Sequence, residues 1–223
     1  LHVLLYKYLD LEDTMPQFAH LPLILKPDGN GKLSKRAADK AGFPIFPLNW
    51  KDPSNNELSI GFKEEGYLAD ALVNFLAFLG WNPGTDQEIM SLEDLIKTFS
   101  LERVNKSGTK FDLDKINWFN QQYLKLIDPI ILAQIVFDQL NSDFQITTTL
   151  DFSKSIVELL KERVTFPKEM APNALYLFKQ PSSYDEKIAS KKWDEEAKLA
   201  VTIFADALQE QERITAESAK ELF

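Results

Sequence analysis

The spacing of apolar residues from Glu64 to the C-terminus constrains the fold of this chain more than any other feature. Leu68 and Leu72 share one side of a predicted helix, which Gly80 ends. Later helices are predicted to begin at capping residues or, at Pro129, with a proline in the first helical turn. The further predicted helices cover residues 91–99, from 112 past 123, from 128 onward, 152–164, 172–178, 184–192, 194–209 and from 215. We therefore expect a mainly α fold with a small α+β part.

The α+β part is predicted in the first third of the chain. Residues 1–13 have a helix-like apolar pattern, and Pro16–Leu25 is predicted to be a buried strand because most of its residues are apolar. Lys26–Gly31 has the composition of a turn. Phe43–Phe62 is predicted to form a hairpin, which its prolines restrict to a sheet edge or an irregular loop.

The composition argues against several classes of protein. The chain has no cysteine and only two histidines, so we expect no disulfide and no metal site built on thiolates or imidazoles. The net charge of −9 argues against a protein covered with basic residues for general nucleic-acid binding. No apolar run reaches the roughly 18 to 20 residues of a membrane span, so we expect a cytoplasmic protein without membrane contact.

Basic residues are nonetheless concentrated in two short stretches. Residues 26–40 contain five basic and two acidic residues. Residues 103–110 contain Arg103, Lys106 and Lys110 and no acidic residue. Charge alone is as consistent with a solvated face as with a surface that contacts RNA.

The first basic stretch contains the pentapeptide Lys32-Leu33-Ser34-Lys35-Arg36, directly after the predicted turn. Two ammonium groups three residues apart on a loop suit a polyphosphate, because lysine is a flexible point charge. An ordinary surface loop has the same composition, so the pentapeptide by itself leaves both interpretations open.

Three separate segments, in a fixed order, match one known family. They are Phe18–Leu25 with the pentapeptide Lys32–Arg36, Gly66–Leu76 with Gly80-Trp81, and Phe111–Tyr123. Together they resemble the bacterial glutamyl-tRNA synthetases, in which the pentapeptide is a form of the class I Lys-Met-Ser-Lys-Ser signature. The chain is similar to the C-terminal portion of such an enzyme, without its nucleotide-binding core.

The resemblance implies a glutamate–tRNA ligase, which activates glutamate with ATP and transfers it to the 3′ end of tRNA(Glu). It implies that Lys35 contacts the ATP phosphates and that Lys32 supports it, so both are catalytic candidates. Leu33, Ser34 and Arg36 would complete the ATP-binding loop with Lys35. Mg²⁺ would bind together with ATP and not through a motif of this chain. We expect a monomer, and we expect this chain alone to be inactive.

The resemblance also implies a domain organisation. Residues 1–30 would end the catalytic domain. Residues 31–127 would hold the lysine loop and a stem-contact domain. Residues 128–223 would form a helical anticodon-binding domain, truncated at its C-terminal end.

Five residues are predicted to contact the nucleic acid. Lys106 and Lys110 flank a flexible Ser-Gly-Thr loop, and Arg103 precedes them. Asn120 and Gln121 are assigned to the polar side of their predicted helix. Plain solvation of these side chains is the alternative.

Aromatic residues and a histidine are predicted to be structural. Trp118, Phe119 and Tyr123 could form a platform for stacked bases, but their spacing on one capped helix favours core packing. His20 lies between apolar residues and is interpreted as a buried structural histidine. Two other functions stay open at this point, a non-catalytic RNA-binding module and an unrelated helical interaction protein. The sequence also leaves open whether such an enzyme would charge tRNA(Gln) as well.

Overall fold

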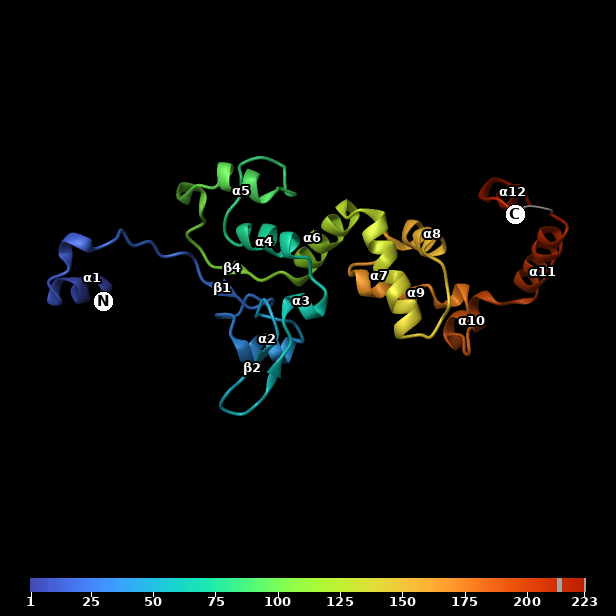
Figure 1. The fold of residues 1–223 in the computed structure, drawn as a ribbon, viewed down its shortest axis with the longest axis horizontal. Coiled ribbons are helices and arrows are strands. Elements are labelled where there is room, and N and C mark those ends of the chain that lie inside the picture. The colour runs from blue at the N-terminus through green and yellow to red at the C-terminus, as the bar shows by residue number, and fades with distance from the viewer. Residues whose placement is uncertain (212–213, 223) are drawn as a thin grey trace. The chain divides into compact units, whose positions relative to one another are not determined.

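The computed structural model describes residues 1–211 and 214–222, and the chain divides into two compact units, Leu1–Ala174 and Leu175–Phe223. In the first unit the helices are α1 (His2–Tyr8), α2 (Lys35–Ala41), α3 (Phe62–Glu65), α4 (Ala69–Ala77), α5 (Leu92–Thr98), α6 (Leu113–Leu126), α7 (Pro129–Ser142), α8 (Leu150–Leu160) and α9 (Met170–Asn173). Its strands are β1 (Ile24–Leu25), β2 (Trp50–Lys51), β3 (Leu58–Ser59) and β4 (Thr109–Lys110). The second unit contains α10 (Glu186–Lys192), α11 (Glu195–Gln209) and α12 (Ala216–Leu222). The prediction of a mainly α fold with a small α+β part is confirmed (Figure 1).

The predicted strand Pro16–Leu25 is mostly wrong. Only β1 is extended and paired, and it runs parallel to β4 with Ile24 opposite Thr109. A strand needs a hydrogen-bonding partner, and the partner here is two residues long and lies more than 80 positions away in the sequence. Residues 16–23 of the predicted strand have no regular structure, and His20 is exposed, so its interpretation as a buried histidine is also wrong.

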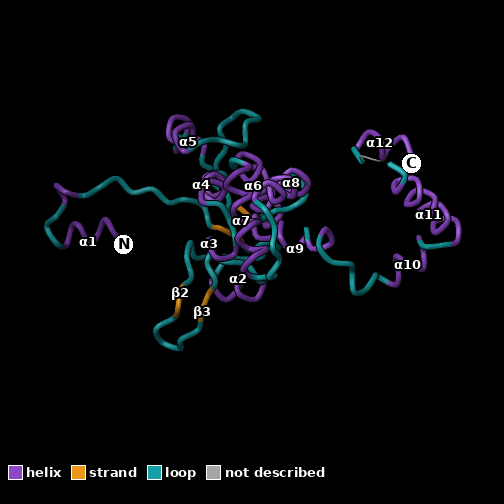
Figure 2. Tube along the Cα trace, turned by 45° about the vertical axis from the view of Figure 1, so that its right-hand side comes forward, coloured by secondary structure: helices purple, strands orange, loops and turns teal. Residues whose placement is uncertain are grey.

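The predicted hairpin within Phe43–Phe62 is confirmed, with shorter strands than expected. β2 and β3 pair in antiparallel fashion, with Trp50 opposite Ser59 (Figure 2). The connecting turn is held by Asp52, whose Oδ1 accepts hydrogen bonds from the Ser54 main-chain N–H at 2.9 Å and the Ser54 hydroxyl at 2.6 Å. This Asx turn keeps the Asp52 carboxylate in a fixed place at the end of β2.

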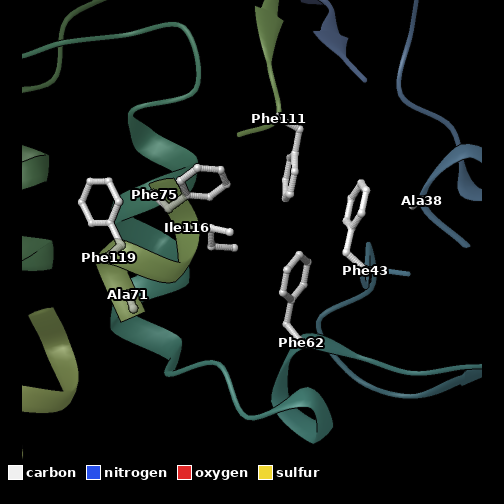
Figure 3. Close-up of a cluster of buried hydrophobic side chains, with 8 residues drawn as sticks. All are labelled: Ala38, Phe43, Phe62, Ala71, Phe75, Phe111, Ile116 and Phe119. Atoms are coloured by element: carbon white, nitrogen blue, oxygen red, sulfur yellow. The ribbon is translucent and has the colours of Figure 1, made fainter. Parts of the chain in front are cut away.

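A cluster of aromatic side chains forms the core around which α2, α4 and α6 are arranged. Phe111 lies among Phe43, Phe62 and Phe75, as Figure 3 shows. Its ring stacks on Phe43 at 5.1 Å between centroids and meets Phe75 edge to face at the same distance. Phe43 directly follows α2 and its Gly42 cap, and Ala38 within α2 is fully buried in the same cluster. The core therefore fixes the helix that carries Lys35.

Helices α6 and α7 begin where the sequence predicts, whereas α8 begins two residues before its predicted start and ends at Leu160, four residues before its predicted end. Asp112 caps α6 by accepting from the Lys115 N–H at 3.0 Å, and Asp128 caps α7 by accepting from the Ile130 N–H at 2.8 Å. α7 and α8 pack side by side (Figures 1 and 2). The fully or nearly fully buried residues of these two helices are Leu132, Ala133, Val136, Leu140, Ser153, Ile156, Val157 and Leu160.

The predicted helices of the second unit are confirmed, and the one before them is wrong. α10 and α11 begin one or two residues inside the predicted ranges, capped by Asp185 and Asp194. Thr215 caps α12, as predicted, because its hydroxyl accepts from the Ser218 N–H at 3.1 Å. The predicted helix 172–178 is instead the end of α9 followed by a 3₁₀ turn, Leu175–Leu177. Among the described residues, no helix combines the length and apolar character that crossing a membrane requires.

Candidate phosphate-binding and RNA-binding sites

The segment from Lys26 to Ala41, hereafter the lysine segment, begins with a tight turn that returns the chain to β1. The Lys26 N–H donates to the Gly31 carbonyl at 3.0 Å, and Leu25 forms an antiparallel bridge with Lys32. Gly31 has a φ of 85°, a conformation that side chains rarely adopt. Lys32 therefore follows a defined turn, and its side chain is exposed to solvent.

The second half of the lysine segment is helical, where the sequence predicted a loop. Ser34 is the N-cap of α2, and its hydroxyl accepts from the Ala37 N–H at 3.3 Å. Lys35 and Arg36 are the first two residues of this helix, and Gly42 ends it with a φ of 73°. Ser34 thus holds the start of α2 in place.

Lys35 lies against the hairpin and not in open solvent. Its Nζ is 3.4 Å from Asp52 Oδ2 and 4.4 Å from the centre of the Trp50 ring. The side chain of Lys35 is 28% exposed and that of Asp52 is 22% exposed. The hydroxyl and main-chain N–H of Ser54 lower the pKa of Asp52, partial burial opposes them, and Lys35 adds a smaller lowering. The carboxylate is therefore ionised at neutral pH and pairs with the Lys35 ammonium.

A hollow of about 480 Å³ lies beside the same segment. Arg36 and Ser34 line it, together with Lys26 and Lys40. The complete lining is Lys26, Pro27, Asp28, Ser34, Arg36, Ala37, Lys40 and Ala41. Three basic groups against one carboxylate make this hollow suitable for an anion such as a phosphate. Sequence reasoning did not single out Lys26 and Lys40, although the turn before Lys32 brings Lys26 close to α2.

The strand pairing brings Lys110 to the lysine segment. Leu25 pairs with Lys110 on one side and with Lys32 on the other. The Lys110 side chain crosses the turn so closely that a Cβ on Gly29 would lie 2.6 Å from its Cε. Lys110 is exposed, as is Lys106. The loop 105–110 and the lysine segment therefore form one basic surface, which the sequence had presented as two.

Arg103 has a protein partner within its own region. Its guanidinium donates a hydrogen bond to the carbonyl of Pro83, in the Asn82–Gly84 loop. The residue is exposed on one side and holds this loop on the other.

Asn120 is not on the polar side of its helix, and that expectation is wrong. It is fully buried, its Oδ1 accepts from the Leu68 N–H at 2.8 Å, and its Nδ2 donates to the Thr165 carbonyl at 2.7 Å. We call this arrangement of Leu68, Asn120 and Thr165 the Asn120 joint. Because Asn120 is fully buried and its amide oxygen and nitrogen each bond to the main chain, RNA cannot reach this side chain. Gln121 is half-buried and donates to the Glu162 carbonyl at 3.4 Å.

The aromatic residues of α6 pack in the core, as predicted. Phe119 is fully buried, and Trp118 and Tyr123 are half-buried against the same cluster. The Tyr123 hydroxyl donates to the Met90 carbonyl at 2.7 Å. These contacts tie the three aromatic side chains to the core. In the part of the chain that the structure describes, no three residues among His, Cys, Asp and Glu are grouped to hold a metal ion.

Two family models together match the whole chain. The model described as "tRNA synthetases class I (E and Q), catalytic domain" matches residues 1–118. The model described as "Anticodon binding domain" matches residues 118–223. The two matches meet within α6, two residues before Asn120.

Relatives of known name are similar over nearly the full chain. A glutamate–tRNA ligase of Cytophaga hutchinsonii is 51% identical over 93% of this chain and 40% of its own length. That of Porphyromonas gingivalis is 46% identical over 99% of this chain and 43% of its own length. The crystal structure of a glutamate tRNA ligase from Elizabethkingia meningosepticum in complex with its amino acid matches with a TM-score of 0.83 and 40% identity, over 99% of this chain and 43% of that one. The chain thus spans about two fifths of the length of these relatives.

Proposed function

Because the chain belongs to the class I tRNA synthetases of the E and Q type, we propose that it is part of a glutamate–tRNA ligase. Such an enzyme joins ATP and glutamate to give glutamyl-adenylate and pyrophosphate, and then moves the glutamyl group to the 3′ end of tRNA(Glu). The observation that carries the proposal is the lysine segment itself. Its pentapeptide stands beside a basic hollow, in a chain about half identical to glutamate–tRNA ligases over nearly all its residues.

The residues of the lysine segment serve the first step. Lys35 and Lys32 offset the negative charge that builds up on the ATP phosphates as the glutamate carboxylate attacks. Arg36 adds a charge at the hollow, and the Ser34 cap with the Leu33 main chain keeps the segment in shape on the adenine side. Positioning and electrostatics account for the rate enhancement, because no residue of this segment forms a covalent bond to substrate.

Mg²⁺ accompanies ATP in this proposal, and no residue of this chain is assigned to hold it. The role of this chain in the first step is therefore confined to its cationic side chains and to the main chain that positions them.

The RNA-binding role follows from the exposed basic groups. We assign Lys106 and Lys110, which are exposed, to contact with a tRNA phosphate. Arg103 and Gln121 are further candidates for contact with the tRNA, Arg103 as an exposed residue of the same basic stretch and Gln121 as a half-buried residue of α6. Lys110 also reaches the turn of the lysine segment, so phosphates of ATP and of the acceptor end of tRNA could share this surface. Asn120 is omitted from this set because it is buried.

The domain organisation belongs to the same proposal. Residues 1–30 end the catalytic domain, residues 31–127 hold the lysine segment and the stem-contact domain, and residues 128–223 belong to the anticodon-binding domain. The enzyme acts as a monomer in the cytoplasm. We expect the chain alone neither to activate glutamate nor to charge tRNA, since it spans only about two fifths of the length of these ligases.

The test is ATP–pyrophosphate exchange by the enzyme that contains this chain, with glutamate and tRNA(Glu) present. Exchange that requires glutamate and is not supported by glutamine is the expected result, together with formation of glutamyl-tRNA(Glu). Charging of tRNA(Gln) in the same assay would extend the substrate range. Salt-sensitive tRNA binding without any exchange would contradict the ligase and favour a non-catalytic RNA-binding protein.

A further inference from the structure

The hairpin formed by β2 and β3 contacts Lys35, the lysine that the proposed function assigns to the ATP phosphates. Asp52, at the end of β2, pairs with Lys35 at 3.4 Å, and the Trp50 ring lies 4.4 Å from the same ammonium (Figure 1 labels α2 and β2). The two hairpin residues belong to one element, and both act on Lys35 Nζ. From this geometry we infer that Asp52 is a counter-ion that holds Lys35 before ATP binds and competes with the ATP phosphates for it.

The competition follows from charge. A lysine ammonium whose side chain is about three quarters removed from solvent needs an anionic partner, and Asp52 supplies it in the absence of ATP. A polyphosphate brings several negative charges to the same ammonium, and a carboxylate close to those phosphates is repelled. Lys35 therefore exchanges Asp52 for the phosphates. Trp50 is neutral and stays favourable in both states, because its ring face attracts the cation without repelling the nucleotide.

The turn that holds Asp52 suits a counter-ion that stays in place when Lys35 leaves. Asp52 Oδ1 is occupied by both groups of Ser54, whereas Oδ2 faces Lys35. The carboxylate is thus anchored by one oxygen and offers the other. Its ionised form is favoured by the same two hydrogen bonds, which lower the pKa of Asp52 more than Lys35 does.

The inference rests on the proposed function, since it names a residue that sets ATP affinity in that reaction. The test variant is Asp52→Asn in the enzyme that contains this chain, because the amide keeps an oxygen for the Ser54 bonds and removes the charge. The control is Glu57→Gln, which removes the same charge from the other end of the same turn, where Glu57 is exposed. We expect Asp52→Asn to lower the KM for ATP in pyrophosphate exchange about two- to five-fold, with kcat at saturating ATP unchanged. Glu57→Gln should leave both parameters unchanged.

A second measurement reports on the contact itself. Reductive ¹³C-dimethylation keeps the charge of lysine, and the Lys35 methyl signal is identified by its loss in Lys35→Arg. Ring currents of Trp50 should shift this signal upfield in the ATP-free enzyme, and Trp50→Leu should remove the shift. Saturating ATP should move the signal in the wild type, because Lys35 leaves Asp52.

The outcomes separate the two proposals. A wild-type enzyme without glutamate-dependent exchange would overturn the proposed function and this inference with it. An active wild type in which Asp52→Asn leaves the KM for ATP at the Glu57→Gln value, or raises it, would overturn the inference alone. A Lys35 methyl signal whose chemical shift changes neither in Trp50→Leu nor on addition of ATP would overturn the inference as well.

Discussion

The lysine segment and the Asn120 joint contain polar side chains that look alike in the sequence and behave differently in the structure. The Lys35 side chain stays partly exposed to solvent, and its charged partner, Asp52, can be replaced by another anion. Asn120 has no exposed surface, and two main-chain groups occupy its amide. A polar side chain is available to a ligand when its partner can be exchanged, and it is structural when its partners are main-chain groups that have no other donor or acceptor nearby.

The comparison also separates two kinds of consequence. Changes at the Asn120 joint should lower stability, because the joint ties the loop before α4 to the loop after α8. Changes in the lysine segment should alter ATP chemistry and lower the free energy of unfolding by only about 1 kcal/mol. The predictions below test this division, beginning with the largest effect.

Replacing Asn120 by Ala should lower the free energy of unfolding by about 2 to 4 kcal/mol. The substitution leaves the Leu68 N–H and the Thr165 carbonyl without their partner in a site closed to water, and each such loss costs about 1 to 3 kcal/mol. Urea unfolding followed by tryptophan fluorescence measures the change.

Gln121→Ala is the matched control, since Gln121 is the next residue on α6 and makes one long hydrogen bond of 3.4 Å. It should change the free energy of unfolding by about 0.5 kcal/mol or less. Equal effects of the two substitutions would show that burial does not distinguish these two amides.

Ser34→Ala tests whether the N-cap at Ser34 stabilises α2, the helix of the lysine segment. Loss of the cap on α2 should cost about 1 kcal/mol, and the cost should be local to this seven-residue helix. Amide hydrogen exchange at Ala37 and Ala38 should become faster, while exchange in α6 should stay the same. Ser107→Ala, at an exposed position outside any helix, serves as the control. Unchanged exchange at Ala37 would mean that the cap does not hold the segment.

Tyr67 provides a test by pH. Burial raises the pKa of Tyr67 to about 12, and Glu65 adds to the shift, while its hydroxyl donates to Asn117 Oδ1 at 2.8 Å. The unfolded chain ionises this phenol near pH 10 and the folded protein only near pH 12, so the contribution to stability is complete below pH 10 and is lost as the pH rises towards 12.

The urea midpoint of the wild type should therefore fall more steeply between pH 9.5 and about 11 than that of Tyr67→Phe. Tyr184→Phe, at a side chain that is 75% exposed, should follow the wild type. Parallel pH curves for the wild type and Tyr67→Phe would contradict the raised pKa.

Much of the helical fold could be predicted from local signals. Asp112, Asp128 and Asp194 mark helix starts because a side-chain oxygen in that position accepts a main-chain N–H of the first turn. The hairpin could be predicted because Asp52 is followed directly by the turn-forming residues Pro53–Asn56. These signals are local, and so the sequence displays them.

Other features depended on partners that are distant in the sequence. Among the residues that the structure describes, β4 is the only strand that pairs with β1, so β1 is short, and no local pattern reveals that pairing. The Lys35–Asp52 pair joins residues 17 positions apart through the hairpin and was not predicted.

Two further signals were present and were not used. Ser34 and Gly42 bracket a seven-residue helix with an N-cap and a left-handed C-cap. Asn120 stands midway between Ile116 and Leu124, four residues from each, so the helical spacing places all three on the buried face.

The central claim, that Lys35 acts on ATP and Asn120 acts on stability, is tested most directly by measuring both variants in both assays. In the enzyme that contains this chain, Lys35→Ala should lower kcat/KM for ATP–pyrophosphate exchange by about two orders of magnitude or more. It should lower the free energy of unfolding by only about 1 kcal/mol, because the substitution removes a partly exposed ion pair with Asp52 and a contact with the Trp50 ring. Asn120→Ala should keep the exchange rate per folded molecule and lose stability. An active Lys35→Ala enzyme, or one whose loss of exchange merely follows its unfolded fraction, would contradict the account.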